Sequence, residues 1–293
     1  MINFTIIIPH KNIPILLQRC LDSIPERDDI QIIVVDDNSD PDKVDFSTFP
    51  GLDRKNTEVY FTKEGKGAGY ARNVGLLHAK GKWLLFADAD DFFTPDLNIV
   101  LDIYKDSEYD VIYFKIKSVD SETLSPANRD EYINNLLEES QKTGNRDLLI
   151  LVVAPWGRFV RRTLIENNNI LFQESRYDND VHFCARLATD TTNILISDFV
   201  FYCITYRQGS LTSVVTKEAA KIRFFVSLDR FYYLKKIGKA DYLYSGIISR
   251  WRYVFGVNKI LAISLIPQMF KIFNIRLSLR FIKQYIKRKK QNI

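Results

Sequence analysis

The stretch WLLFADADDFFTP (residues 83–95) places four apolar residues shortly before three carboxylates, those of Asp88, Asp90 and Asp91. The run 82–87 predicts a short buried strand, and the acids follow its carboxyl end. Like charges at this spacing repel one another, and a buried carboxylate without a partner shifts its pKa or destabilises the fold. We therefore expect a positive group beside these acids.

The chain before this stretch alternates short buried strands with helices. Apolar, β-branched runs predict three strands, at 4–8, 30–35 and 58–62, and helical spacing predicts helices over 13–24 and 70–79. This alternation predicts an α/β fold built on a mostly parallel sheet, in which ligands bind beyond the carboxyl ends of the strands. Polar groups that follow strands should therefore meet at one edge: His10 to Asn12, Asp36 with Asp37, and Asp88 to Asp91.

The second half of the chain carries fewer clear signals. A strand is expected at 110–117, a surface helix around 130–141, and one or two strands within 194–206. From Lys217 onward the pattern is helical. No internal repeat and no low-complexity linker is visible.

The composition is that of a globular protein: 293 residues, 46% hydrophobic and 26% charged. The three cysteines have no metal-ligand spacing and form no close pair, as is typical of core thiols in a reducing cytosol. We expect no secretory signal, because the apolar start lacks a basic region and ends at Pro9. No stretch reaches the roughly 20 apolar residues that span a bilayer. A cytoplasmic location is expected.

The alternate carboxylates Asp88 and Asp90 suit a hard divalent cation. Mg²⁺ or Mn²⁺ takes one or two carboxylates, keeps several waters and accepts phosphate oxygens. The spacing alone is weak evidence, since Asp-x-Asp is common in surface loops. The buried strand before it, and the second acidic strand end at Asp36 and Asp37, strengthen the interpretation.

Several motifs, in this order, together resemble family 2 glycosyltransferases, which have the GT-A fold and use nucleotide-diphosphate sugars. The motifs are the first strand with Asn12, IVVDDNS (33–39), GYARNVG (69–75), FADADD (86–91), PWG (155–157) with Arg161 and Arg162, residues 177–183, and YRQGSLT (206–212). The resemblance covers roughly the first 215 residues. It implies a GT-A domain at 1–215, with a nucleotide-sugar half (1–110) and an acceptor half (111–215).

The resemblance also implies roles on the nucleotide side. Asp37 is similar to the acid that hydrogen-bonds the nucleobase, with Asp36 beside it and the backbone around Pro9 lining the same pocket. Arg72 resembles the residue that contacts the phosphate region. Asp88 is similar to the acid that faces the ribose and the sugar.

On the catalytic side, Asp90 resembles the principal ligand of Mn²⁺ or Mg²⁺. Asp180 matches the acid of the family that acts as general base. The family often has a Glu-Asp pair where this chain has Asn179 and Asp180, so Asp178 stays open as the base. Trp156 is expected to stack on a sugar or to wall the acceptor cleft, since aromatic rings present flat apolar faces.

Structural alternatives accompany these roles. Asp36 and Asp37 are able to cap a turn, because Asx side chains accept backbone N–H groups. Arg72 is alternatively a plain salt-bridge partner, Trp156 a core residue, and Asp180 a helix N-cap. A further departure from the family is Lys11, where a Tyr often precedes the first-strand Asn.

The charge distribution is uneven. Eleven of the 41 Lys and Arg residues and none of the 36 Asp and Glu residues lie after Asp241, so residues 1–241 carry a net charge of −6. Within the extension 216–293, apolar and basic residues alternate at helical spacing over 269–286. Such a basic amphipathic helix lies in a membrane interface or packs on the catalytic body. The acidic body disfavours nucleic acid as a partner.

These observations predict a metal-dependent, inverting glycosyltransferase. It would move a hexosyl or hexosaminyl group from a nucleotide-diphosphate donor to a glycan or lipid-linked acceptor in cell-surface polysaccharide synthesis, as a peripheral protein on the cytoplasmic face of the membrane. The alternatives are a metal-dependent nucleotidyltransferase, a receiver-like signalling domain, and a sugar-binding module without catalysis. A nucleotidyltransferase usually has a basic Gly-rich loop near the first strand, which is missing after Pro9. A receiver domain is much shorter and ends its first strand with the acidic pair.

Overall fold

The computed structural model describes residues 1–207 and 215–272. The chain forms two compact units, Met1–Ser210 and Leu211–Ile293, each described here by itself. The domain boundary expected after residue 215, and the division of the first domain at residue 110, stay predictions. Residues 273–293, which include most of the expected basic helix, lie outside the described residues.

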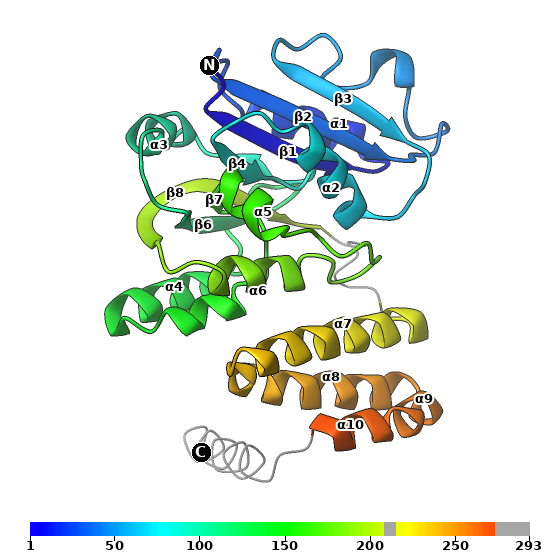
Figure 1. Ribbon diagram of the computed structural model, residues 1–293. Coiled ribbons are helices and arrows are strands. Elements are labelled where there is room, and N and C mark those ends of the chain that lie inside the picture. Colours follow the sequence, from blue (N-terminus) through cyan, green and yellow to red (C-terminus); the bar gives the residue numbers. More distant parts are fainter. Residues whose placement is uncertain (208–214, 273–293) are drawn as a thin grey trace. The chain divides into compact units, whose positions relative to one another are not determined.

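The first unit is built on one eight-stranded sheet (Figure 1). The order of its strands is β3-β2-β1-β4-β7-β6-β8-β5. Their bounds are β1 Phe4–His10, β2 Ile30–Asp37, β3 Thr57–Thr62, β4 Trp83–Phe86, β5 Phe92–Phe93, β6 Val111–Asp120, β7 Arg158–Arg161 and β8 Ile194–Tyr206.

The first four strands pair in parallel, as expected for a doubly wound α/β sheet. The second half is mixed. β7 runs antiparallel to both β4 and β6, β6 pairs in parallel with β8, and β5 runs antiparallel to β8. β7 was not predicted, because its four residues, RFVR, form no continuous apolar run like the WLLF of β4. The stretch 194–206, expected as one or two strands, is the single strand β8.

Helices cover both faces of the sheet. In the first unit the helices are α1 Pro14–Asp22, α2 Ala68–His78, α3 Leu97–Tyr104, α4 Glu131–Thr143, α5 Arg162–Asn168 and α6 Val181–Thr189, with short 3-10 helices η1 Phe46–Thr48 and η2 Arg146–Leu151. α1 and α3 pack with alternate residues of β1 and β2 in one large core. Residues Ile33 and Val35 of β2 pack against Ala71 of α2 on the opposite face.

Burial on both faces explains the continuous apolar runs of β1 and β2. Gly75 of α2 shows how close the layers are, since a Cβ there would lie 2.5 Å from Cγ2 of Ile7. Ile7 is paired with Phe86 of β4, whose ring contacts Phe183 of α6 edge to face at 5.4 Å. α2 and α6 therefore lie on the same face of the sheet.

The second unit is helical in its described part. It contains α7 Lys217–Lys236, the 3-10 helix η4 Ala240–Tyr242, α8 Tyr244–Val257, α9 Lys259–Ser264 and α10 Ile266–Ile272. α7 packs on α8, and the indole of Trp251 in α8 donates to the carbonyl of Ala262 in α9 at 3.0 Å. Across residues 1–207 and 215–272, no helix has both the length and the apolar character to cross a membrane.

Candidate active site

Three neighbouring strands, β2, β1 and β4, deliver polar residues to one edge of the sheet. The sheet order places β1 between the other two, and all three run in parallel. β1 ends at His10, β2 ends at Asp37, and Asp88 is the second residue after the end of β4. Two of the expected polar groups thus end neighbouring strands, and the third follows β4 at the same edge.

Asp36 is buried, and its hydrogen bonds lie within the protein. Its Oδ1 accepts from the backbone N–H of Ser39 at 2.9 Å, and its Oδ2 accepts from His10 Nδ1 at 2.7 Å and from the Ser39 hydroxyl at 2.5 Å. Nε2 of His10 accepts the N–H of Ile13, which leaves the proton on Nδ1. Although burial favours the neutral acid, hydrogen bonds from His10 and Ser39 hold the pKa of Asp36 below its usual value. Asp36 therefore stabilises the turn after β2 through its hydrogen bonds to Ser39.

Asp37 is only 3% exposed but keeps one oxygen free. Its Oδ2 accepts from the N–H of Gly67 at 2.9 Å and lies 3.5 Å from Nζ of Lys11, which also donates to the Asp37 carbonyl at 2.8 Å. Its Oδ1 is buried and has no hydrogen-bond partner among the described residues. A buried carboxylate oxygen without a donor is costly, so this atom points to a ligand that carries an N–H or O–H group.

The helix α2 connects the two acidic strand ends. Gly67, which donates to Asp37, is its N-cap residue and has a φ of +95°, a conformation that favours glycine. Less than two turns later, Arg72 is buried at 4% exposure and donates through Nη2 to Asp88 Oδ1 at 2.5 Å. The same helix therefore contacts the acid after β2 and the acid after β4.

The loop that leads to Asp180 is held against α2. The Asn73 side chain donates to the Phe172 carbonyl at 3.0 Å and accepts the Phe172 N–H at 2.9 Å. Gly69 permits the close approach, since a Cβ there would lie 2.1 Å from the Gln173 carbonyl oxygen. Nη1 of Arg72 donates to Asn179 at 2.9 Å. These contacts bring the loop before α6 beside the Asp88 carboxylate.

Asp180 is the residue immediately before α6, and its side chain makes no capping hydrogen bond. Burial raises the pKa of this carboxyl to about 6; the charge of Arg72 opposes the rise, and the charges of Asp88 and Asp178 add to it. Asp178 has a φ of +53° and accepts the N–H of Val181 through its carbonyl at 3.4 Å. A carboxyl with this pKa is suited to proton transfer near neutral pH.

Residues of β8 donate hydrogen bonds to the acidic loop Asp88–Asp91. The Asp91 carboxylate is buried, accepts the Thr205 N–H at 2.7 Å through Oδ1 and the Tyr202 hydroxyl at 2.9 Å through Oδ2. Burial and the charges of Asp88 and Asp90 nevertheless raise the pKa of Asp91 well above its usual value. The electrostatic repulsion expected from the sequence is therefore present.

Arginines supply part of the expected positive charge. Arg72 pairs with Asp88, and Nε of Arg207 pairs with Oδ2 of Asp90 at 3.0 Å. A third guanidinium, that of Arg19, donates to the Asp90 carbonyl at 2.5 Å. Arg72 thus forms the salt bridge that was the alternative interpretation, and its contact with the phosphate region stays a prediction.

The side chains at this loop fit a divalent cation. Each arginine contacts only one oxygen of its acid, so the second oxygens of Asp88 and Asp90 have no partner among the described residues. Carboxylate oxygens are the ligands that Mg²⁺ and Mn²⁺ prefer. Within the described part of the chain no three acidic, His or Cys side chains form a cation cage. Asp88 and Asp90 are thus each able to offer one oxygen to a cation.

Trp156 is partly buried and stacks on Tyr202, with ring centroids 5.7 Å apart and planes 17° apart. It packs against the large core, as the core alternative expects, and its place on the acceptor side stays a prediction. Pro9 is buried within β1 and is paired with Val35, one residue before the two acids of β2.

Several residues that shape this site were not predicted from the sequence. Tyr202 and Thr205 hold the acidic loop, Arg19 and Arg207 contact it, and Asn73 anchors the loop before Asp180. Arg207 and Asn73 belong to motifs quoted for the resemblance, but no local pattern indicated their partners. Arg207 lies 117 residues from Asp90 along the chain.

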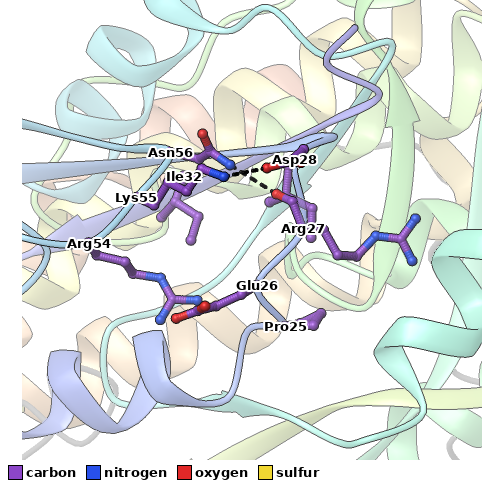
Figure 2. Close-up of a pocket in the computed structure, with 9 residues that line it drawn as sticks. Pro25, Glu26, Arg27, Asp28, Ile32, Arg54, Lys55 and Asn56 are labelled. Carbon is purple, nitrogen blue, oxygen red and sulfur yellow. Dashed lines mark hydrogen bonds and ion pairs between the residues drawn. The ribbon is translucent and has the colours of Figure 1, made fainter.

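A cavity of about 180 Å³ lies elsewhere, at the amino end of β2 (Figure 2). Its lining residues are Pro25, Glu26, Arg27, Asp28, Ile30, Ile32, Arg54, Lys55 and Asn56. β2 begins at Ile30 and ends at Asp37, so roughly 20 Å of strand separates this cavity from the acidic edge. Charged groups here pair with one another, as Lys55 does with Asp28 at 2.7 Å.

This fold is that of the GT-A class. The family described as Glycosyl transferase family 2 matches residues 5–168, and the chain belongs to that family.

Two bacterial relatives show the same likeness in sequence. Glycosyltransferase GlyA of Streptococcus pneumoniae is 25% identical over 229 residues, which cover 73% of this chain and 32% of GlyA. The poly(ribitol-phosphate) beta-N-acetylglucosaminyltransferase TarS of Staphylococcus aureus is 25% identical over 219 residues, 71% of this chain and 36% of TarS. The chain thus spans about a third of the length of these two relatives.

Solved structures agree on the fold. TarS residues 1–349 in complex with UDP-GlcNAc match with a TM-score of 0.62 and 21% identity, covering 90% of this chain and 76% of that one. The mannosyltransferase PcManGT of Pyrobaculum calidifontis, in complex with GDP-Man and Mn²⁺, matches with a TM-score of 0.53 and 18% identity. The match covers 97% of this chain and 79% of that one.

Proposed function

We propose that this chain is a metal-dependent, inverting glycosyltransferase. It transfers a hexosyl or hexosaminyl group from a nucleotide-diphosphate sugar to a glycan or lipid-linked acceptor in cell-surface polysaccharide synthesis. The observation that supports this best is the free, buried Oδ1 of Asp37, which lies on the same sheet edge as the acidic loop Asp88–Asp91. One edge thus offers an acceptor for a nucleobase and an oxygen-rich site for a cation.

At the nucleobase end, Asp37 Oδ1 would accept an N–H of the base. Asp36 would hold the turn that carries Asp37, because its own oxygens are already bonded to His10 and Ser39. The backbone around Pro9 would line the same pocket. Nζ of Lys11 lies 3.5 Å from Asp37 Oδ2, so it would hold this carboxylate in place beside the base.

At the diphosphate end, Asp90 would be the principal ligand of Mn²⁺ or Mg²⁺, and Asp88 would face the ribose and the sugar. When bound, the cation stabilises the negative charge of the departing nucleoside diphosphate. Arg72, at the same point, would contact the phosphate region. Its unpartnered, buried Nε supports a further hydrogen bond to a ligand.

At the acceptor end, Asp180 would take the proton from the attacking hydroxyl. A general base works best when its pKa lies near the working pH, and the value of about 6 leaves this acid ionised at neutral pH. The lack of a capping bond leaves its side chain available. A single displacement from the face opposite the leaving group inverts the anomeric carbon. Asp178 is the second candidate for the base, and Trp156 would wall the acceptor side.

The relatives support a polymeric or lipid-linked acceptor at the cell surface. TarS is named for transfer of N-acetylglucosamine to poly(ribitol-phosphate), and its structure was determined with UDP-GlcNAc. We propose by analogy that the acceptor of this chain presents hydroxyl groups on a cell-surface polymer or its lipid-linked precursor. UDP and GDP sugars are the donors to test first.

The second unit would hold the protein at the cytoplasmic face of the membrane. The chain has eleven basic and no acidic residues after Asp241. In the described part, Ile260 and Ile263 of α9 are 82% and 59% exposed, and Phe270 of α10 is 73% exposed, near Lys259 and Lys271 in the chain. Exposed apolar side chains among cations suit an anionic lipid surface.

Donor binding tests the proposed function directly. Calorimetric titration of UDP-GlcNAc and GDP-mannose should show binding with Mn²⁺ and much weaker binding with EDTA. Asp37→Ala should weaken the binding of both nucleotides, and Lys55→Ala, at the opposite edge, should not. Failure of both donors to bind with Mn²⁺ would overturn the proposal. Release of free nucleotide over time, with Asp90→Ala as the control, separates an enzyme from a silent sugar-binding module.

Membrane contact has its own test. The full chain should float with vesicles that contain anionic phospholipid and not with neutral ones. Replacing Ile260 and Ile263 by Ser should reduce flotation without changing donor binding. Equal flotation of the variant and the parent protein would show that Ile260 and Ile263 of α9 do not contribute to membrane binding.

A further inference from the structure

Strand β8 lies against the acidic loop and supplies it with hydrogen bonds from two side chains. The hydroxyl of Tyr202 accepts the backbone N–H of Asp88 at 2.9 Å and donates to Asp91 Oδ2 at 2.9 Å. Tyr202 is fully buried, so water does not replace either bond. One hydroxyl group therefore fixes both ends of the loop Asp88–Asp91.

Thr205 provides a second attachment three residues later. Its backbone N–H donates to Asp91 Oδ1 at 2.7 Å, and its hydroxyl donates to the Asp90 carbonyl at 2.7 Å. The loop is also closed on itself, since the Asp91 N–H donates to the Asp88 carbonyl at 3.0 Å. Three of the four loop residues, Asp88, Asp90 and Asp91, are thus held by hydrogen bonds, while the carboxylates of Asp88 and Asp90 remain partly exposed.

The ring of Tyr202 extends the connection beyond the loop. It stacks on Trp156 at 5.7 Å and meets Phe93 of β5 edge to face at 5.3 Å. Phe93 is itself paired with Tyr202 in the sheet. Tyr202 therefore joins the acidic loop to the residue expected on the acceptor side.

We propose that Tyr202 and Thr205 are positioning residues that set the separation of the Asp88 and Asp90 carboxylates for a divalent cation and the donor diphosphate. The inference rests on the proposed function. Neither residue needs to touch the cation. Residues bonded to metal ligands orient them, and their loss typically lowers metal affinity by about 10- to 100-fold.

The competing explanation is that Tyr202 is simply a buried residue whose hydroxyl stabilises the fold. Tyr113 of β6 provides a matched control, because it is also a tyrosine of the same sheet and is only 1% exposed. Its hydroxyl lies 3.4 Å from Nη1 of Arg158 and contacts no residue of the acidic loop. A purely structural role predicts the same outcome for Tyr202→Phe and Tyr113→Phe.

The experiment measures Mn²⁺ affinity in the presence of UDP, by electron paramagnetic resonance of free Mn²⁺, together with urea unfolding of each variant. Tyr202→Phe should bind Mn²⁺ about 10- to 100-fold more weakly than the parent protein. Tyr113→Phe should bind Mn²⁺ as the parent does. Thr205→Val should weaken binding in the same direction as Tyr202→Phe, and Thr205→Ser, which keeps the hydroxyl, should restore it.

Each outcome decides a different point. Parent-like Mn²⁺ affinity in both Tyr202→Phe and Thr205→Val would overturn the inference and leave the proposed function intact. A parent protein that binds neither Mn²⁺ nor UDP would instead overturn the proposed function. If Tyr202→Phe fails to fold, the comparison of Thr205→Val with Thr205→Ser still decides, because equal affinities in these two variants would defeat the inference.

Discussion

The two ends of the parallel strands differ in whether their charged side chains have partners. At the amino end, Arg27 donates to Asp29 at 2.8 Å and to Asp102 at 2.9 Å, and Lys55 pairs with Asp28. At the carboxyl end, Asp37 keeps a buried oxygen without a donor, and three carboxylates crowd one loop. At the amino end the charged side chains satisfy one another, whereas at the carboxyl end a buried carboxylate oxygen has no donor among the described residues.

This difference indicates where ligands are to be expected. A cavity alone does not mark the site, since the cavity of Figure 2 lies at the end where charges are paired. Unsatisfied buried polar atoms, and carboxyl groups whose pKa is raised by burial, gather where a ligand completes the interactions. Substitutions at the carboxyl end should therefore change binding and transfer, and substitutions at the amino end should change stability.

The largest effect is expected for Asp90→Asn. Loss of this carboxylate should lower sugar transfer by about 10³-fold, because a cation contributes several kcal/mol of charge stabilisation in the transition state. Stability should change little, since the substitution also relieves repulsion with Asp88 and Asp91. Steady-state transfer and urea unfolding measure the two quantities. If Asp90→Asn were inactive because it unfolds, the expectation that substitutions at the carboxyl end change transfer and not stability would be contradicted.

A smaller loss, about 10²-fold, is expected for Asp180→Asn, because general-base catalysis contributes at least that much. Donor affinity should stay unchanged, since the base acts on the acceptor. Asp178→Asn is the matched control two residues away. If Asp178→Asn proves the more damaging of the two, the assignment of the base moves to Asp178.

The pH dependence of transfer should follow the ionisation of Asp180. The base acts as a carboxylate, and its pKa is raised to about 6, so kcat/KM should fall about tenfold per unit as the pH drops below 6. The charge of Asp178 contributes to this raised pKa. Asp178→Asn should therefore move the acid limb to lower pH, and an unshifted limb would contradict the stated cause.

The smallest effect is expected at the amino end. Arg27→Ala removes hydrogen bonds to two carboxylates and should lower the free energy of unfolding by about 1–2 kcal/mol, with kcat/KM unchanged. Lys55→Ala breaks a fully exposed pair and should leave the urea midpoint at its parental value. A loss of transfer in Arg27→Ala would contradict the expectation that residues at the amino end do not contribute to activity.

Much of the structure of residues 1–110 was predictable because its signals are local. Strands buried on both faces appear as continuous apolar runs, so β1 to β4 were found within a few residues of their bounds. Acids directly after such strands meet at one edge, since parallel neighbours end together. The placement of Asp37 and Asp88 followed from this, although their roles stay predictions.

The contacts between distant segments were not predictable from pattern. Tyr202 lies 114 residues from Asp88, and Asn73 lies 99 residues from Phe172. β7 is a four-residue antiparallel strand between β4 and β6, and no local period indicated it. Such pairings depend on how the sheet is ordered, and side-chain periodicity carries no information about that order.

The amino-acid order alone established the α/β class, the acidic strand ends and the basic extension, because each arises from neighbours along the chain whose burial and charge are set by composition and period. The folded arrangement added which oxygen of Asp37 stays free, which arginine meets which acid, and how β8 supports the loop of Asp88. Those features depend on atoms brought within 3 Å of one another from remote parts of the chain, and their geometry exists only once the sheet has closed.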